Sequence, residues 1–279
     1  MIFPRLIGAA LVTAVVVGSV QTGVQRWHAA PLILAAEGYE DQKVVTPKPA
    51  ESLAAPAHAQ DAAPHAHDHG PAKQWEPENG AERIGWTWVA NILHAFSIAL
   101  LVFAVMGVWL YRRGAPVLGT RASLRLAGMV AAAGWLSFHL WPSLGLHAEV
   151  PGVQVAPLVA RQVWWVLAVG CAAGACAVAG FSHASWRWLV AAALLALPFV
   201  VGAPQLQGDP MAGFGAEARA ALEQLGAKFI WATTWISLSF WISMGLVGGL
   251  AFQRWVGSAV VAAVRGADAP NPDTVKPAA

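Results

Sequence analysis

Long apolar runs dominate this chain and set its predicted architecture. A helix needs about 20 consecutive apolar residues to cross about 30 Å of hydrocarbon, and six runs approach that length. They cover residues 2–24, 87–111, 126–146, 162–181, 186–203 and 230–252. The pattern predicts an all-α integral membrane protein, with a bundle of about six transmembrane helices.

Two of these runs leave the number of crossings open. The first carries Arg5 ahead of its most apolar part, as a secretory signal would, but it lacks a clear A-x-A cleavage site and is long enough to span. The fifth run is short and contains Pro198. We expect an uncleaved anchor in residues 1–30, and five helices if that anchor is cleaved or the fifth run does not cross.

The segments between the runs predict the domain organisation. Residues 31–86 form one extracytoplasmic loop, whose first part, 31–40, is apolar but too short to cross and is typical of an interfacial segment. The following stretch, to about residue 85, is too polar to offset the entropy of ordering, which predicts disorder. Five helices would form a membrane bundle over 87–255, and a disordered cytoplasmic tail would follow over 256–279.

The composition agrees with a chain embedded in a lipid bilayer. Apolar residues make up 57% of the sequence and charged residues 11%, whereas soluble domains carry about 25% charged residues. Tryptophans gather near the ends of the runs, as an aromatic belt requires. They are Trp27, Trp86, Trp88, Trp109, Trp164, Trp186, Trp188, Trp231 and Trp255. The net charge of +2, with no basic face interleaved with aromatics, argues against nucleic acid as a partner.

Basic residues set the expected orientation. Arg112, Arg113, Arg121 and Arg125 lie in or near one short connection between apolar runs, and such clusters favour the cytoplasmic side. This arrangement puts both termini in the cytoplasm and the long loop in the periplasm, for a multi-pass protein of a bacterial inner membrane.

A histidine cluster lies inside the long loop. It comprises His58, His65, His67 and His69, with Asp61 and Asp68 among them. Imidazole and carboxylate together suit borderline divalent ions such as cobalt, nickel and zinc. Alternate histidines share a face in an extended chain, and His65 and His69 share one in a helix. The cluster predicts metal capture, and the alternative is compositional drift in a solvated linker.

Two further histidines lie within apolar runs, where burial is costly and a functional role is the default hypothesis. At 1.5 Å per residue, both His94 and His139 fall in the outer third of the membrane, together with Thr233, Thr234 and Ser237. Asn91 shares a helical face with His94 and belongs to the same layer. His147 and Glu149 would line the outer mouth. The layer predicts a metal path; interhelical packing is the alternative reading.

Two glycine motifs and the two cysteines are predicted to serve in helix packing. Gly170-x-x-x-Gly174 and Gly245-x-x-x-Gly249 predict close helix contacts. Cys171 and Cys176 are five residues apart in one run, which places them on different helix faces and argues against a disulfide or a metal pair.

Several stretches in order along the chain resemble the CbtA family, the proposed membrane subunit of a bacterial cobalt transporter. They are PLILAAEGYE (31–40), the His-rich loop, WEPENGAER (75–83), SLGLHAEVPG (143–152), ARQVWW (160–165), and ALP (196–198) leading to GAP (202–204). A histidine often follows the ALP triplet in this family, whereas this chain has Phe199.

The resemblance implies cobalt uptake for cobalamin synthesis, together with a small single-span, His-rich CbtB-type subunit. Cobalt would be the transported substrate, and we expect no permanently bound cofactor. The runs contain no lysine or arginine positioned to repel a cation. There is no G-x-x-x-x-G-K-[ST] phosphate loop to energise transport, and no constellation of nucleophile, base and orienting group that would indicate an enzyme. Transport of another divalent ion such as nickel, and a non-transporting scaffold that buffers metal, remain alternatives.

The expected orientation can be tested by cysteine labelling in intact cells. A thiol reagent that cannot cross the membrane should modify a cysteine placed at Ala63 and leave one at Ala115 unmodified. The opposite labelling pattern would reverse the orientation and remove the proposed capture role of the loop.

Overall fold

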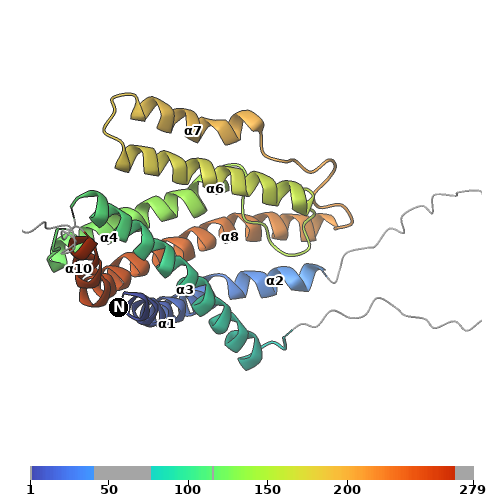
Figure 1. The fold of residues 1–279 in the computed structure, drawn as a ribbon. Helices are drawn as coiled ribbons and strands as arrows, with labels where there is room; N and C mark the ends of the chain where they lie inside the picture. The colour runs from blue at the N-terminus through green and yellow to red at the C-terminus, as the bar shows by residue number, and fades with distance from the viewer. Residues whose placement is uncertain (1, 41–76, 115, 268–279) are drawn as a thin grey trace, which may run out of the picture.

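The computed structural model describes residues 2–40, 77–114 and 116–267 (Figure 1). In those ranges the regular elements are all helical, so the all-α prediction is confirmed there. The His-rich stretch predicted to be disordered and the end of the tail, 268–279, lie outside the described residues.

The helices follow one another with short connections, and some join end to end. They are α1 (Phe3–His28), α2 (Ala30–Glu40), α3 (Ala81–Arg112), α4 (Thr120–Trp135), the π-helical turn η1 (Leu136–Leu140), α5 (Trp141–Ser143), α6 (Leu158–Phe181), α7 (Arg187–Val201), α8 (Ala216–Ser243), the π-helical turn η2 (Met244–Gly248), α9 (Gly249–Ala251), the π-helical turn η3 (Phe252–Val256) and α10 (Gly257–Ala267). Residues 120–143 and 216–267 are therefore continuous helical rods.

The predicted runs lie in helices, but their lengths differ from expectation. By length and apolar composition, four helices among the described residues could cross a membrane: α1, α3, α6 and the rod that runs from α8 to α10. Helix α7 is apolar but has only 15 residues. The six-helix count therefore remains a prediction. The last run is longer than predicted because the helix begins at Ala216 and continues to Ala267, into the segment predicted to be a disordered tail.

The main core lies where α1, α3, α4 and the rod from α8 to α10 meet. Phe103, Met106 and Leu110 of α3 are fully buried there beside Phe252 of η3. Buried Thr13 and Thr22 of α1 donate their hydroxyl hydrogens to carbonyls of their own helix, which satisfies them without water. Helix α7 lies on the outer side of α6 (Figure 1).

A second, smaller core forms at one end of the bundle. Ala36 of α2 packs there with Val150, Phe214, Ala218 and Leu222. We call this end, comprising residues 30–40, 144–157 and 202–229, the cap. Residues 31–40 were predicted to be an interfacial segment; they form α2, which is packed against the first turns of α8.

Both glycines of the predicted motif in the last rod pack closely on another helix, but only one of the two glycines in the α6 motif does. A methyl group added at Gly249 would lie 2.9 Å from Ala127 Cβ, and one at Gly245 would lie 3.2 Å from Ala131 Cβ, so this pair faces α4 closely. In α6 the corresponding position at Gly174 meets Leu194 at 3.5 Å, but nothing lies within 4 Å at Gly170. Gly170 therefore has no close helix contact, and its predicted role is wrong.

The tryptophans divide into exposed and buried groups. Trp27, Trp186, Trp188 and Trp231 are well exposed, as expected for a belt, whereas Trp164 is 3% exposed. Its indole Nε1 donates to the Pro198 carbonyl of α7 at 3.0 Å, and Trp141 Nε1 donates to the Leu195 carbonyl at 3.0 Å. Trp164 was placed in the belt wrongly, because its run end is covered by α7.

The packing of α1 on α3 predicts that Gly18→Ala destabilises the protein. A methyl group at Gly18 would lie 2.8 Å from the backbone nitrogen of Ile92, and backbone cannot move aside cheaply. We expect a loss of about 1–3 kcal/mol, measured by thermal unfolding in detergent. The control is Gly23→Ala in the same helix, where nothing lies within 4 Å; equal losses in the two variants would contradict this packing.

Candidate functional site

A cavity of about 620 Å³ opens between the membrane helices and the cap. Its walls come from α1, α2, the start of α3, η1, α6 and α8. The polar lining residues are Gln21, Thr22, Gln25, Arg26, Asn79, Arg83, Thr87, His94, His139, Thr233 and Ser237. Phe138, Trp165, Phe240 and Trp241 form its aromatic side, and beyond Phe240 along α8 lies the packed main core.

The structure brings His94 and His139 to this one cavity. His94 comes from α3, and its ring lies 5.1 Å from the ring of Phe240, measured between centroids. His139 comes from η1; its ring lies 6.1 Å from Trp135, and its Nε2 lies 3.4 Å from Thr234 Oγ1. The two imidazoles, 45 positions apart in sequence, thus line one cavity, whose lining is mostly apolar.

His139 occupies an unusual backbone position. It lies in a π-helical turn, in which the Trp141 amide donates to the Leu136 carbonyl five residues earlier. Pro142 follows and has no amide hydrogen to return to the regular ladder. Such turns are rare and are frequent at functional sites. The turn was not predicted, although Pro142 just after an intramembrane histidine is a sequence signal for a disturbed helix.

The hydrogen bonds around Thr234 are compatible with one tautomer of a neutral His139. When the Thr234 hydroxyl donates to the Ile230 carbonyl, which lies 2.8 Å away, its oxygen is free to accept from His139 Nε2. A neutral imidazole that donates from Nε2 keeps a lone pair on Nδ1. His139 can therefore act as an acceptor or a metal ligand through its other nitrogen.

The other members of the predicted polar layer separate into two groups. Thr233 and Ser237 line the cavity, whereas Thr234 contacts it only through His139. Asn91, one turn from His94, is buried, and its Nδ2 donates to Thr22 Oγ1 at 2.9 Å and to Gln25 Oε1 at 2.7 Å. For Asn91 the packing interpretation is therefore the right one.

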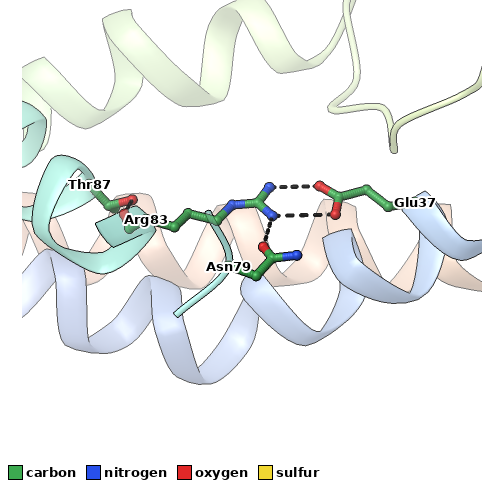
Figure 2. A network of polar contacts seen from close by, with 4 residues as sticks. All are labelled: Glu37, Asn79, Arg83 and Thr87. Carbon is green, nitrogen blue, oxygen red and sulfur yellow. Dashed lines mark hydrogen bonds and ion pairs between the residues drawn. The ribbon is translucent and has the colours of Figure 1, made fainter. Parts of the chain in front are cut away.

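An ion pair between Arg83, which lines the cavity, and Glu37, which does not, joins α3 to α2 (Figure 2). Arg83, in the first turns of α3, contacts both carboxylate oxygens of Glu37 in α2, at 2.6 and 3.3 Å, and also donates to Asn79 Oδ1 at 2.7 Å. Bidentate guanidinium–carboxylate pairs are directional. At 38% and 35% exposure of the two side chains, the pair is worth about 1 kcal/mol at most, so it can break.

His147 and Glu149 do not line the cavity. His147 is exposed, and Glu149 Oε2 lies 3.1 Å from Arg161 Nη2. In the same end of the molecule Asp209 pairs with Arg219, whose hydrogen bond, with that of the Met211 amide, lowers the pKa of Asp209. A ligand role for Glu149 would require that its ion pair open.

The charges around the cavity correct one expectation. Arg26 and Arg83, just outside the ends of the first and second apolar runs, line it, and none of the described carboxylates is among its lining residues. Among the described residues no group of three or more His, Cys, Asp or Glu side chains could hold a metal. Opposite or like charges about 4 Å apart interact by about 1 kcal/mol in water but by several times more where water is excluded.

The proposed capture histidines His58, His65, His67 and His69 lie outside the described residues. The helices on either side of that segment are described: α2 ends at Glu40 and α3 begins at Ala81. The Glu37–Arg83 pair therefore joins the two helices between which the histidine-bearing segment runs, beside the cavity rim.

With this geometry in place, a comparison with protein-family models gives a decisive match. The model described as "Probable cobalt transporter subunit (CbtA)" matches residues 3–253. The chain belongs to the CbtA family. The comparisons with curated proteins and with solved structures gave no match. Family and apolar helices together make this CbtA-family chain a multi-pass membrane protein and a transporter subunit, and the family is not one of enzymes.

Phe199, where the resemblance led us to expect a histidine, lies away from the cavity. Its ring packs edge-on against Trp141 and Trp164, with centroid distances of 5.5 and 6.1 Å. A histidine at this position in the same fold would meet those indoles. The substitution therefore leaves the lining of the cavity unchanged.

The cavity predicts that a cysteine at Ser237 is reachable from water. In a chain with Cys171→Ala and Cys176→Ala, a charged maleimide should modify Ser237→Cys in lipid nanodiscs. Ser239→Cys, two residues further along α8 and not a lining residue, should react much more slowly, because it lacks contact with the cavity. Comparable rates, followed by mass spectrometry, would show that the cavity does not hold water.

Proposed function

We propose that this chain is the subunit that carries cobalt across the bacterial inner membrane, inward, for use in cobalamin synthesis. The observation that carries the proposal is the meeting of His94 and His139, from separate helices, in one cavity beside the helices that flank the histidine-bearing loop. Membership of a family described as a cobalt transporter subunit names the metal.

In this proposal the loop collects metal and the cavity receives it. His58, His65, His67 and His69 would bind the ion weakly in the periplasm, and the Glu37–Arg83 pair lies where the loop meets the cavity rim. The two intramembrane histidines then flank the route inward, with His147 and Glu149 nearer the surface. Neutral imidazole is needed at each step, so capture should weaken as the pH falls below about 6.5.

The passage beyond the cavity must open by rearrangement. Trp241 packs against Phe240 and Phe138, with ring centroids 5.4 and 6.0 Å apart. Phe103 and Met106 of α3, both fully buried, lie in the core beyond these rings. The π turns η1 and η2 flank this barrier and supply backbone with alternative hydrogen-bond registers. The energy would come from an ion gradient, a partner subunit such as a single-span CbtB-type chain, or trapping of the metal downstream.

His139→Ala tests the function directly. In cells that express the chain together with its partner subunit, this change should abolish cobalt accumulation while the amount of protein in the membrane stays near normal. One interhelical hydrogen bond is worth only about 0.6–2 kcal/mol, which should not prevent folding. The matched control is His183→Ala, which removes an exposed histidine remote from the cavity and should leave uptake unchanged.

Replacing His65, His67 and His69 with alanine distinguishes transport from metal buffering. Transport predicts a higher cobalt concentration for half-maximal uptake and an unchanged maximal rate, because only capture is impaired. If accumulation depends on these loop histidines alone and His139→Ala accumulates normally, the chain is a buffering scaffold. Nickel and cobalt accumulation measured in parallel decides between the two metals, which His ligation alone does not separate.

A further inference from the structure

We propose that the cavity binds an anionic phospholipid, whose phosphate lies at Arg26 and Arg83 and whose acyl chain lies against the apolar wall. This ligand is additional to the metal of the proposed function, and its binding can be measured in the absence of cobalt. The lining, the position of its charges and its depth in the membrane support the assignment.

Most of the cavity wall is apolar. Ile33 and Leu34 of α2 and Phe229 and Ile236 of α8 line it, together with the aromatic side chains described above. Pockets of about 300–1,000 Å³ with mainly apolar walls and a few polar groups are typical of small-molecule sites, and this cavity, at about 620 Å³, falls within that range. An apolar ligand stabilises such a wall by removing it from water.

The cationic side chains of the lining lie at one end of the cavity. Arg26 is in the last turn of α1 and Arg83 is in the first turn of α3. Helices α1 and α3 pack against each other and run in opposite directions (Figure 1), so these two turns lie at the same end of the pair. Exposed Trp27 and Trp86 are within three residues of them in sequence, as is typical of the level of the lipid headgroups. The positive end therefore lies where lipid phosphates are found.

The charge at this end suits one negative group. Arg83 pairs with Glu37, which balances its charge. Arg26 is exposed, and none of the described carboxylates lies within ion-pairing distance of it. One positive charge is therefore left for the single negative charge of a phosphodiester, which guanidinium groups bind through paired hydrogen bonds. Asn79, whose Oδ1 accepts from Arg83, lines the same end and can donate from its Nδ2.

The cavity has the depth of one lipid leaflet. On α3 its lining extends from Arg83 to Ile98, 15 residues further into the bundle, which is a rise of about 22 Å at 1.5 Å per residue. Half of a bilayer of about 40–45 Å, headgroups included, is about 20–22 Å. A phospholipid with its phosphate at the arginines would therefore lie in its ordinary orientation, with the acyl chain directed toward Phe240.

The lipid and the metal of the proposed function would occupy the cavity in turn. His94, 11 residues along α3 from Arg83, and His139 line the inner part of the cavity, so an acyl chain there would cover both imidazoles. Bound lipid would fill the apolar space while no metal passes, and it would leave before the imidazoles take an ion.

Photo-crosslinking in lipid nanodiscs tests the site. The full chain is placed in phosphatidylcholine with a small share of phosphatidylglycerol that carries a diazirine in one acyl chain, and the crosslinked residues are identified by mass spectrometry. We expect crosslinks at Ile33, Phe229 or Ile236 that excess unlabelled phosphatidylglycerol lowers severalfold and excess phosphatidylcholine does not. Crosslinks confined to lipid-exposed side chains such as Leu189 and Val200 of α7 would overturn the proposal.

Arg26→Gln tests the recognition of the headgroup. It should lower the crosslinking of cavity residues by phosphatidylglycerol severalfold, whereas Arg113→Gln, at the other end of α3 and outside the lining, should not. Unchanged crosslinking in folded Arg26→Gln protein would show that the acyl chain alone is bound, and the proposal would be wrong.

Inorganic phosphate distinguishes a lipid from a free anion. Millimolar phosphate should leave the crosslinking of the cavity unchanged, because the acyl chain contributes most of the contact. If phosphate competes, the arginine end binds a free anion and the lipid assignment is wrong. None of these measurements uses cobalt, so failure of the chain to take up cobalt would contradict the proposed function and leave this site in place.

Discussion

An imidazole inside an apolar helix bundle must keep its ring nitrogens hydrogen-bonded, because an unpaired polar group away from water costs several kcal/mol. This constraint connects the main features of the structure. The π turn places His139 beside Thr234, and both His94 and His139 line one cavity. Ile33, Leu34 and Phe229 of the cap line the same cavity, which therefore lies between the membrane helices and the small second core.

The cap end of the molecule carries three weak, reversible ion pairs. Arginine–carboxylate pairs join α2 to α3, the start of α6 to its preceding loop, and the start of α8 to its own loop, and of their residues only Arg83 lines the cavity. Each is partly exposed and is worth little to stability. Under the proposed function, weak ion pairs at this end would let the cavity open to the periplasm while the packed core keeps the bundle folded, and the histidine-bearing segment is joined to α2 and α3 at the same end.

The sequence predicted those properties that follow from local pattern. Apolar runs long enough to span gave the helices, and equal depth along antiparallel helices put His94 and His139 in one layer. The properties that depend on distant residues were not predictable in this way: the cap needs Ala36 to meet Phe214 and Leu222, and Trp164 is buried only because α7 covers it. The Glu37–Arg83 pair and the π turn at His139 also arise from tertiary contacts. Depth along the helix was also not sufficient: Asn91 lies one turn from His94, but its side chain bonds to α1 and does not line the cavity.

The central claim is that cobalt passes through this cavity, and blocking the cavity chemically tests it most directly. The measurement is cobalt uptake by the Ser237→Cys chain, without its native cysteines, before and after complete modification with a positively charged thiol reagent. If cobalt passes through the cavity, modification abolishes uptake, and the Ser239→Cys chain treated in the same way transports as before. Undiminished uptake by fully modified Ser237→Cys protein would contradict it, since the metal would then be taking another route.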